Sequence, residues 1–274
     1  MTESSAVIGV FDSGLGGLSV VRALRQQLPQ HPLIYLADQA HVPYGPRSLR
    51  EVRSFSEEIT RHLLAQGAAL IVVACNTASA AALHYLREIY AQFPFVGMEP
   101  AVKPAAEQTH SHVVGVLATP ATFQGELYAS VVERFARGVT VLQDTCPGLV
   151  QEIEAGRPQG VAARRILENA LRPMLDKNID TIVLGCTHYP FVIPLIEEIA
   201  GPAVRVIDPA PAVARQTARL LASRGLAGGQ RRQPDRFLTT GDPATLAASL
   251  RTMLGENNPH TAGLRWQDGR LTSP

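Results

Sequence analysis

The feature that most constrains the fold is an apolar, β-branched run that ends in a cysteine and occurs twice. Residues 71–74 lead into Cys75 and an alanine-rich stretch with helical spacing, and residues 181–185 lead into Cys186 and a second polar turn. Each pattern is typical of a buried strand followed by a loop and a helix N-terminus. We therefore expect two thiols at the ends of two equivalent strands.

A second match supports a repeat. Gly9 and Gly115 occupy the same place in two similar apolar runs and are 106 residues apart, while Cys75 and Cys186 are 111 residues apart. The two offsets agree within ordinary variation of loop length. We therefore infer an internal duplication in which each copy contributes one thiol loop.

Apolar runs and helical patterns alternate along the chain, which predicts an α/β fold with mostly parallel sheets flanked by helices. Together with the repeat, this predicts two similar lobes related by a pseudo-twofold axis, with the site between them. The first lobe is expected to comprise residues 1–97 and 209–274, and the second residues 98–208. A polar, glycine-rich loop is predicted at residues 225–236, and the tail beyond Leu254 is weakly patterned.

The bulk composition indicates a globular protein with a small ligand. Of 274 residues, 46% are hydrophobic and 18% are charged, which suffices for one large core or two modest ones. The net charge of +1, without a Lys/Arg cluster, argues against nucleic acid and against an anionic membrane surface. Because neither a signal-peptide pattern nor an apolar run of about 18 residues occurs, a cytoplasmic location is expected.

The three cysteines are too few and too scattered for a disulfide framework, and none forms a Cys-x-x-Cys pair. We therefore expect free thiols and no metal site. Cys146 precedes Pro147 in a turn and is interpreted as buried packing. Cys75 and Cys186 both follow strands and both precede a polar residue, so they are interpreted as functional.

Polar residues gather at the predicted strand ends. Asp12, Cys75, Thr119 and Cys186 are all expected at the carboxyl ends of parallel strands, where ligands bind. Helix N-termini attract carboxylates and lower the pKa of a nearby thiol from about 8.5. Both thiols are therefore expected to be partly thiolate. These loops contain no Lys or Arg that could bind an anionic ligand, so hydroxyl and amide groups are expected to bind it through hydrogen bonds.

Two thiols that face each other across a pocket suit one reaction in particular. One thiolate removes a proton from one face of a carbon, and the other thiol delivers a proton to the opposite face. A racemase that uses pyridoxal phosphate needs a Schiff-base lysine instead. Lys103 and Lys177 are the only lysines, and neither is expected on a strand-end loop. No cofactor is therefore expected.

Five blocks of the sequence together resemble one family. They are residues 11–17, Asp38 with residues 43–45, residues 74–80, Thr119 with Thr122, and residues 185–190. In this order and spacing the chain resembles the glutamate racemases of the cofactor-independent aspartate/glutamate racemase superfamily, from residue 8 to about residue 254. The resemblance implies racemisation of L-glutamate to D-glutamate, which would supply peptidoglycan synthesis for a bacterial cell wall.

The resemblance also implies roles for individual residues. Cys75 would act on the α-proton of D-glutamate and Cys186 on that of L-glutamate, while Asp12 and His188 would tune proton transfer. The residues implied to bind the carboxylates and the amine of the substrate are Asp12, Ser13, Tyr44, Gly45, Asn76, Thr77, Thr119, Thr122, Thr187 and His188.

The family further places a glutamate near the histidine, in a Cys-Pro-x-x-Val-Pro-x-x-Glu pattern. The segment that begins at Cys146 departs from this pattern at Gln151, where proline is usual. Glu154 keeps the spacing, and Glu152 is additional. We expect Glu154 to support His188 in catalysis.

Other functions compete with this interpretation. The nearest is an aspartate racemase or another amino-acid racemase of the same superfamily, whereas a decarboxylase of that superfamily needs only one thiol. A nicotinamide-dependent oxidoreductase would use Gly14, Gly16 and Asp38, but Ser19 stands where the third glycine of its fingerprint belongs. A non-enzymatic binding protein would tolerate loss of both cysteines. The expected partner is a small-molecule substrate, and a homodimer is one candidate assembly.

Overall fold

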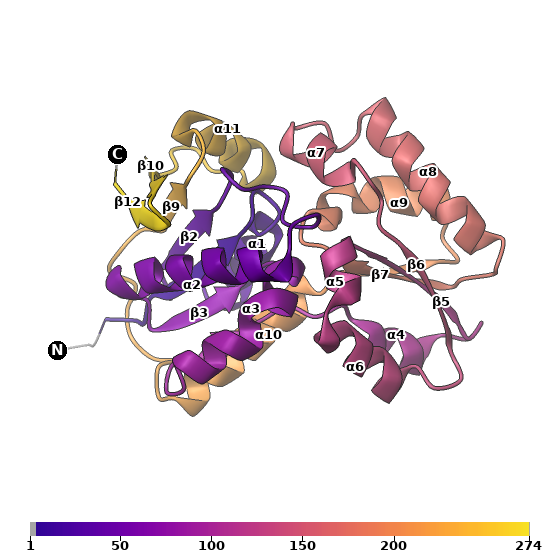
Figure 1. Ribbon diagram of the computed structural model, residues 1–274, viewed down its shortest axis with the longest axis horizontal. Helices are drawn as coiled ribbons and strands as arrows, with labels where there is room; N and C mark the ends of the chain where they lie inside the picture. The colour runs from indigo at the N-terminus through magenta and orange to yellow at the C-terminus, as the bar shows by residue number, and fades with distance from the viewer. Residues whose placement is uncertain (1–3, 274) are drawn as a thin grey trace.

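Residues 4–273 are described in the computed structural model of the chain, which consists of two lobes lying side by side (Figure 1). The first lobe is built on a six-stranded sheet in the order β10-β9-β2-β1-β3-β4, with every pair of neighbours parallel. Its strands are β1 (Ile8–Asp12), β2 (Leu33–Ala37), β3 (Leu70–Val73), β4 (Phe95–Val96), β9 (Arg236–Thr239) and β10 (Thr261–Gly263).

Helices cover both faces of this sheet, because its strands carry apolar side chains on both sides. One face packs against α1 (Leu18–Gln27), α10 (Ala210–Ser223) and α11 (Pro243–Leu254). The other face packs against α2 (Leu49–Ala65) and α3 (Asn76–Ile89). A capping box between Ser48 and Glu51 begins α2, and the Cys75 side chain caps α3.

The second lobe is a smaller sheet of the same kind, in the parallel order β6-β5-β7-β8. Its strands are β5 (Val113–Ala118), β6 (Thr140–Asp144), β7 (Thr181–Gly185) and β8 (Arg205–Ile207). The helices α7 (Leu149–Glu154), α8 (Val161–Leu175) and α9 (Ile193–Ala200), with the 3-10 helix η1 (Tyr189–Val192), pack on one face. The other face packs against α4 (Val102–Gln108) and α6 (Glu126–Phe135), and α5 (Pro120–Gln124) begins at Thr119.

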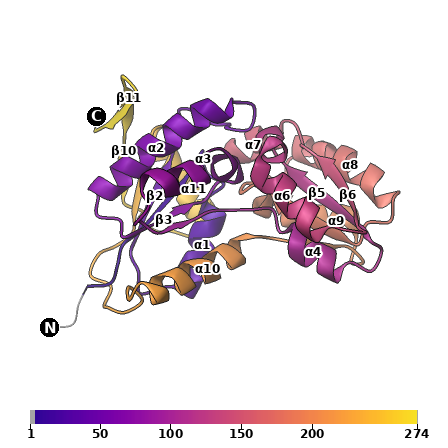
Figure 2. The same ribbon diagram turned by 60° about the horizontal axis from the view of Figure 1, so that its bottom comes forward.

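The strand orders explain the sequence repeat. In the first lobe the order β2-β1-β3-β4 has the same succession as β6-β5-β7-β8 in the second, so β1 corresponds to β5 and β3 to β7. Gly9 and Gly115 therefore occupy equivalent central strands, and Cys75 and Cys186 follow equivalent neighbours. The predicted α/β fold of two lobes with parallel, helix-flanked sheets is confirmed. The chain crosses between the lobes after β4 and again after β8 (Figure 2).

The tail beyond Leu254 is more ordered than its weak pattern suggested. It supplies the edge strand β10 and an antiparallel hairpin of β11 (Arg265–Gln267) and β12 (Arg270–Thr272). Strands of three residues are too short for a period of two to stand out in a sequence. The hairpin lies over the first lobe, where β12 contacts α2.

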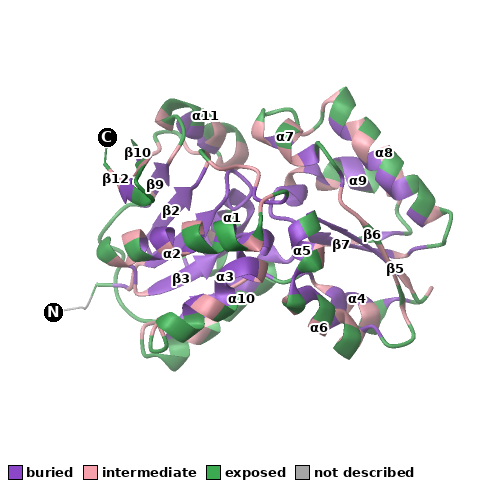
Figure 3. Cartoon of the chain, in the orientation of Figure 1, coloured by how far each residue is buried: buried purple, intermediate pink, exposed green. Residues whose placement is uncertain are grey.

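Burial follows this layered arrangement (Figure 3). The central strands β1, β2, β3 and β7 are buried along their whole length, whereas the outer faces of the helices are exposed. Within residues 4–273, no helix is both long enough and apolar enough to span a membrane. Because all strands of both main sheets are parallel, the loops after their carboxyl ends are the places where polar side chains converge.

Candidate active site

The two predicted thiols line one narrow cavity between the lobes. Cys75 follows β3 in the first lobe and Cys186 follows β7 in the second, and they are 4% and 5% exposed. The cavity encloses about 270 Å³ of empty space. Its walls are formed by Ser13, Tyr44, Gly45, Cys75, Asn76, Thr77, Thr119, Val150, Cys186, Thr187 and His188.

Three residues of the predicted site lie one contact behind these walls. Asp12 is fully buried against the Cys75 thiol. Glu154 contacts His188, and the Thr122 hydroxyl lies 2.9 Å from that of Thr119. These side chains contact residues of the wall and do not line the cavity themselves.

On the Cys75 side, the sulfur accepts the backbone N–H of Ala78 at 3.4 Å, as expected at a helix N-terminus. The Asp12 carboxylate beside it accepts the N–H of Gly17 at 2.6 Å. Burial raises the pKa of the Cys75 thiol well above its ordinary value, and the charge of Asp12 raises it further. Burial also raises the pKa of Asp12, against the opposing charge of His188.

The expectation of a partly ionised thiol is therefore wrong for Cys75. A helix N-terminus does offer its sulfur one N–H, but desolvation and an adjacent carboxylate both favour the neutral thiol. The position of Cys75 before a predicted helix indicates the N–H contact. It does not indicate the burial of the thiol or the neighbouring carboxylate. Burial and the adjacent Asp12 carboxylate thus both raise the pKa of the Cys75 thiol and favour its neutral form.

On the Cys186 side, His188 is the key neighbour. Its Nδ1 atom lies 3.7 Å from the Cys186 sulfur, and its Nε2 atom lies 2.6 Å from Oε1 of Glu154. Burial lowers the pKa of His188, but the hydrogen bonds to Cys186 and Glu154 and their charges outweigh it, so the pKa is raised well above its ordinary value. These partners therefore favour the imidazolium form of His188, which has the Cys186 sulfur on one side and the Glu154 carboxylate on the other.

Glu154, rather than Glu152, is the partner of His188. Burial raises the pKa of Glu154, but the hydrogen bond and charge of His188 and the N–H of Leu15 lower it overall. Glu152 instead pairs with the exposed Arg157 at 2.9 Å. Residues two apart on a helix point to opposite sides, so α7 can direct only one of the two glutamates inward.

The glycine-rich turn after β1 serves contact between the lobes. A Cβ atom on Gly16 would lie 2.6 Å from Nδ1 of His188, and one on Gly14 would overlap the Glu154 carboxylate. The N–H of Leu15 donates to Oε1 of Glu154 at 2.6 Å. The turn therefore lets the backbone of the first lobe approach the His188–Glu154 pair of the second, a use of glycine for close approach.

The polar wall contains a buried amide that has no hydrogen-bond partner in the described part of the chain. The Asn76 side chain is buried, and neither its oxygen nor its nitrogen has a hydrogen-bond partner within residues 4–273. Such a group costs about 1–3 kcal/mol when it is left unpaired. A short distance away, the hydroxyls of Thr77 and Thr119 meet across the lobes at 2.8 Å. The wall is therefore arranged for a ligand with donors and acceptors of its own.

Val150 was not predicted as a site residue, yet its side chain supplies apolar surface to the cavity. Its signal was present in the valine of the Cys-Pro-x-x-Val pattern. Cys146, in contrast, is 2% exposed, packs in the core of the second lobe and does not line this cavity.

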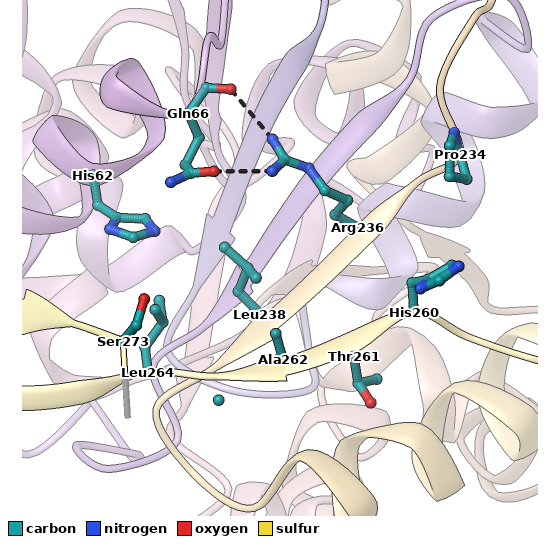
Figure 4. A pocket seen from close by; sticks show the side chains of 11 residues that line it. His62, Gln66, Pro234, Arg236, Leu238, His260, Thr261, Ala262, Leu264 and Ser273 are labelled. Carbon is teal, nitrogen blue, oxygen red and sulfur yellow. Dashed lines mark hydrogen bonds between the residues drawn. The ribbon is translucent and has the colours of Figure 1, made fainter.

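A wider cavity lies at the edge of the first sheet, beside β9 and β10 (Figure 4). It holds about 930 Å³ of empty space, part of it open to solvent, and none of the predicted site residues lines it. Arg236 lines this cavity, and its guanidinium donates to the side-chain oxygen and to the backbone oxygen of Gln66. The volume of a cavity therefore does not identify the candidate active site in this protein. The narrow cavity holds the convergent polar groups.

Known proteins resemble the chain over nearly its whole length. The Asp/Glu/hydantoin racemase family matches residues 16–217. A glutamate racemase from Ectopseudomonas mendocina is 51% identical over 93% of this chain and 97% of its own. One from Pseudomonas aeruginosa PAO1 is 49% identical over 96% of this chain and 98% of its own.

Solved structures agree with the fold. A glutamate racemase isoform from Bacillus anthracis superimposes with a TM-score of 0.85 at 31% identity, over 98% of this chain and 100% of the other. Glutamate racemase from Francisella tularensis, solved in complex with D-glutamate, superimposes with a TM-score of 0.82 at 31% identity, over 94% of this chain and 97% of the other. The chain therefore belongs to the Asp/Glu/hydantoin racemase family of isomerases.

Proposed function

We propose that the protein interconverts L-glutamate and D-glutamate by proton transfer between two thiols, without a cofactor. One observation carries the proposal: Cys75 and Cys186 line the same narrow cavity from equivalent strand ends in opposite lobes. Groups placed in this way can act on opposite faces of one α-carbon, which is the geometry that stereoinversion needs. The relatives named glutamate racemase, at up to 51% identity over 93% of this chain, support glutamate as the substrate.

The two thiols have different partners and therefore different tasks. Cys75 acts on the α-proton of D-glutamate, and Asp12 accepts the thiol proton so that the sulfur can serve as a base. Cys186 acts on the α-proton of L-glutamate, with His188 and Glu154 tuning its proton transfer. Burial raises the pKa of Asp12, which suits it to receive a proton from a neighbour.

The protons balance in each direction. One thiolate removes the α-proton and becomes a thiol, while the opposite thiol gives its proton to the other face and becomes a thiolate. The negative charge that develops at the α-carbon and carboxylate needs fixed donors in a dry site. The residues proposed to bind the substrate are Asp12, Ser13, Tyr44, Gly45, Asn76, Thr77, Thr119, Thr122, Thr187 and His188.

We assign the parts of the chain to two domains, residues 1–97 with 209–274 and residues 98–208. Each main sheet falls within one of these parts, which supports the division.

We also propose that the D-glutamate formed supplies peptidoglycan synthesis. Growth of a D-glutamate-requiring bacterial strain on expression of this chain tests that role, and continued dependence on added D-glutamate rejects it.

Turnover in deuterated water tests the mechanism. Purified protein without added cofactor is incubated with L-glutamate, and the enantiomers are separated by chiral chromatography and weighed by mass spectrometry. We expect deuterium at Cα of the inverted product, while substrate recovered early stays protonated. A single base would label both pools equally, and that result rejects the two-thiol scheme. L-Aspartate in a parallel reaction tests the alternative substrate, and its faster turnover would reassign the enzyme.

A further inference from the structure

A buried carboxylate behind the active site collects four side-chain donors. Asp38 follows β2 and is 0% exposed. Its Oδ2 atom accepts the Tyr44 hydroxyl at 2.7 Å and contacts Nδ1 of His41 at 2.8 Å. Its Oδ1 atom accepts the Thr240 hydroxyl at 2.8 Å and the indole N–H of Trp266 at 2.7 Å. Since a carboxylate offers about four lone-pair positions, these partners saturate Asp38.

The Trp266 donor arrives from the far end of the chain. Trp266 lies on β11, in the hairpin that the C-terminal tail folds over the first lobe. The hairpin is anchored on α2, where the N–H of Leu271 donates to Glu58 at 2.7 Å. The indole ring also packs against His41, at 5.1 Å between ring centroids, and against Phe55 at 5.6 Å. Trp266 is therefore held on two sides while its N–H reaches Asp38.

On its other side, Asp38 holds part of the active-site wall. Tyr44 is 1% exposed, and with Gly45 it lines the catalytic cavity. Gly45 packs closely on the second lobe, since a Cβ atom placed on it would lie 3.0 Å from Cβ of Thr119. Thr119 is also the residue whose hydroxyl meets Thr77 across the lobes. The orientation of the Tyr44 side chain therefore affects the wall where the two lobes meet.

We propose that Trp266 is a positioning residue for the reaction and that it acts through Asp38 on the wall formed by Tyr44 and Gly45. An indole N–H can only donate, so it holds Oδ1 in place, and the planar carboxylate then directs Oδ2 at Tyr44. Without this donor Oδ1 keeps only the Thr240 hydroxyl among its described side-chain partners, so the carboxylate is held less firmly and its bond with the tyrosine weakens. This inference rests on the proposed glutamate racemisation. It gives the C-terminal hairpin a function in substrate binding.

The test compares Trp266→Phe with the wild type in steady-state racemisation from both enantiomers. Phenylalanine keeps an aromatic ring and removes the N–H. We expect KM to rise roughly tenfold for L- and D-glutamate alike, with kcat within about twofold, because the Tyr44 side chain that lines the cavity is then less firmly oriented. Arg270→Ala is the matched control, since it removes the 3.6 Å ion pair between this hairpin and Glu58 but leaves the indole in place. Its KM should equal that of the wild type.

A second variant replaces the indole by a ring of nearly the same shape, which keeps its packing against His41 and Phe55. Trp266 is the one tryptophan of the sequence, so biosynthetic replacement of tryptophan by benzothienylalanine changes this site alone. The analogue has almost the shape of indole but carries sulfur in place of N–H. We expect the same rise in KM. A lowered melting temperature with an unchanged KM, in either protein, would mean that Trp266 only stabilises the fold, and it would overturn the proposal.

A double-mutant cycle tests the route through Asp38. Tyr44→Phe removes the hydroxyl that Asp38 accepts, and combining it with Trp266→Phe should raise KM no further than Tyr44→Phe alone. Fully additive effects on KM would exclude this route.

The wild-type protein separates failure of the proposed function from failure of the role of Trp266. Absence of glutamate turnover by the wild type rejects the proposed function. The affinity for D-glutamate of the wild type and of Trp266→Phe, measured by calorimetry, then still decides the role of the hairpin.

Discussion

Nε2 of His188 lies 2.6 Å from Oε1 of Glu154, and this buried pair joins the loop of the second thiol to α7. The same carboxylate oxygen accepts the N–H of Leu15 from the first lobe at 2.6 Å. One glutamate therefore orients the imidazole and links the two lobes. Its loss should affect catalysis and the contact between the lobes together.

Glu154→Gln should lower kcat about tenfold, because the bond to His188 loses the carboxylate charge, and hydrogen bonds to charged groups exceed neutral ones by about 1–1.5 kcal/mol. Glu152→Gln is the matched control, as Glu152 pairs only with the exposed Arg157 among its described contacts. Its kcat should stay within twofold of the wild type. Steady-state assays by chiral chromatography measure both variants, and equal losses in the two would contradict the assignment of Glu154.

The pH dependence of stability should report on the same pair. The folded-state pKa of His188 is raised above its ordinary 6.5, so its contribution is complete below about pH 6.5 and is lost as the pH rises through the folded-state value. The pKa of Glu154 is lowered from 4.5, so its contribution is present above about pH 4.5 and is lost on acidification. Urea midpoints measured from pH 3 to pH 10 should fall at both ends. Glu154→Gln should flatten both limbs, and a profile unchanged by this variant would argue against the ion pair.

Cys75→Ala and Cys186→Ala should each abolish interconversion, because a general acid or base typically contributes about 10²–10⁴-fold. Cys146→Ala is the control, since Cys146 is equally buried but lies outside the catalytic cavity. It should keep nearly full activity with a modest loss of stability. Chiral chromatography of glutamate after incubation decides between these outcomes. Equal tolerance at all three positions would favour a binding protein over an enzyme.

Asn76→Ala should have opposite effects on stability and on binding. The buried amide has no hydrogen-bond partner among residues 4–273, so removing it should raise the free energy of unfolding of the ligand-free protein by about 1 kcal/mol. KM for glutamate should rise roughly tenfold, because the substrate loses the amide that it would pair with. Urea unfolding and steady-state kinetics measure the two quantities. A loss of stability with an unchanged KM would show that the amide serves the fold and not the ligand.

Gly16→Ala should disturb the active site while leaving the lobes folded. The added methyl group would meet Nδ1 of His188 and Oγ1 of Thr187, each at 2.6 Å. Displacement of a catalytic group by about 1 Å can cost about 10²-fold in rate, so a loss in kcat of that order is expected. Gly228→Ala is the control, because among the described residues no atom beyond its chain neighbours lies within 4 Å of the added Cβ. Full activity of Gly16→Ala, with normal circular dichroism, would show that the close approach is dispensable.

The sequence by itself determined the lobes and the place of the thiols. Short β-branched runs separated by helical patterns restrict a chain to parallel α/β layers, and the carboxyl ends of such strands always lie at one edge of the sheet. The polar residues at those ends were therefore predictable as neighbours. The glycine-rich turn was visible as well, although its contact with His188 and Glu154 was not.

Only the tertiary structure decided the direction in which the pKa of Cys75 shifts, the contact through which Glu154 and not Glu152 meets His188, and the position of Trp266. The first depends on desolvation and on the Asp12 carboxylate, which come from packing rather than from the helix N-terminus. The second depends on which side of α7 faces the first lobe. The third depends on a hairpin of three-residue strands whose indole meets Asp38 from 228 residues away. Each is an interaction between segments distant in the chain, and the geometry of such contacts is set by packing rather than by the periodicity of a local segment.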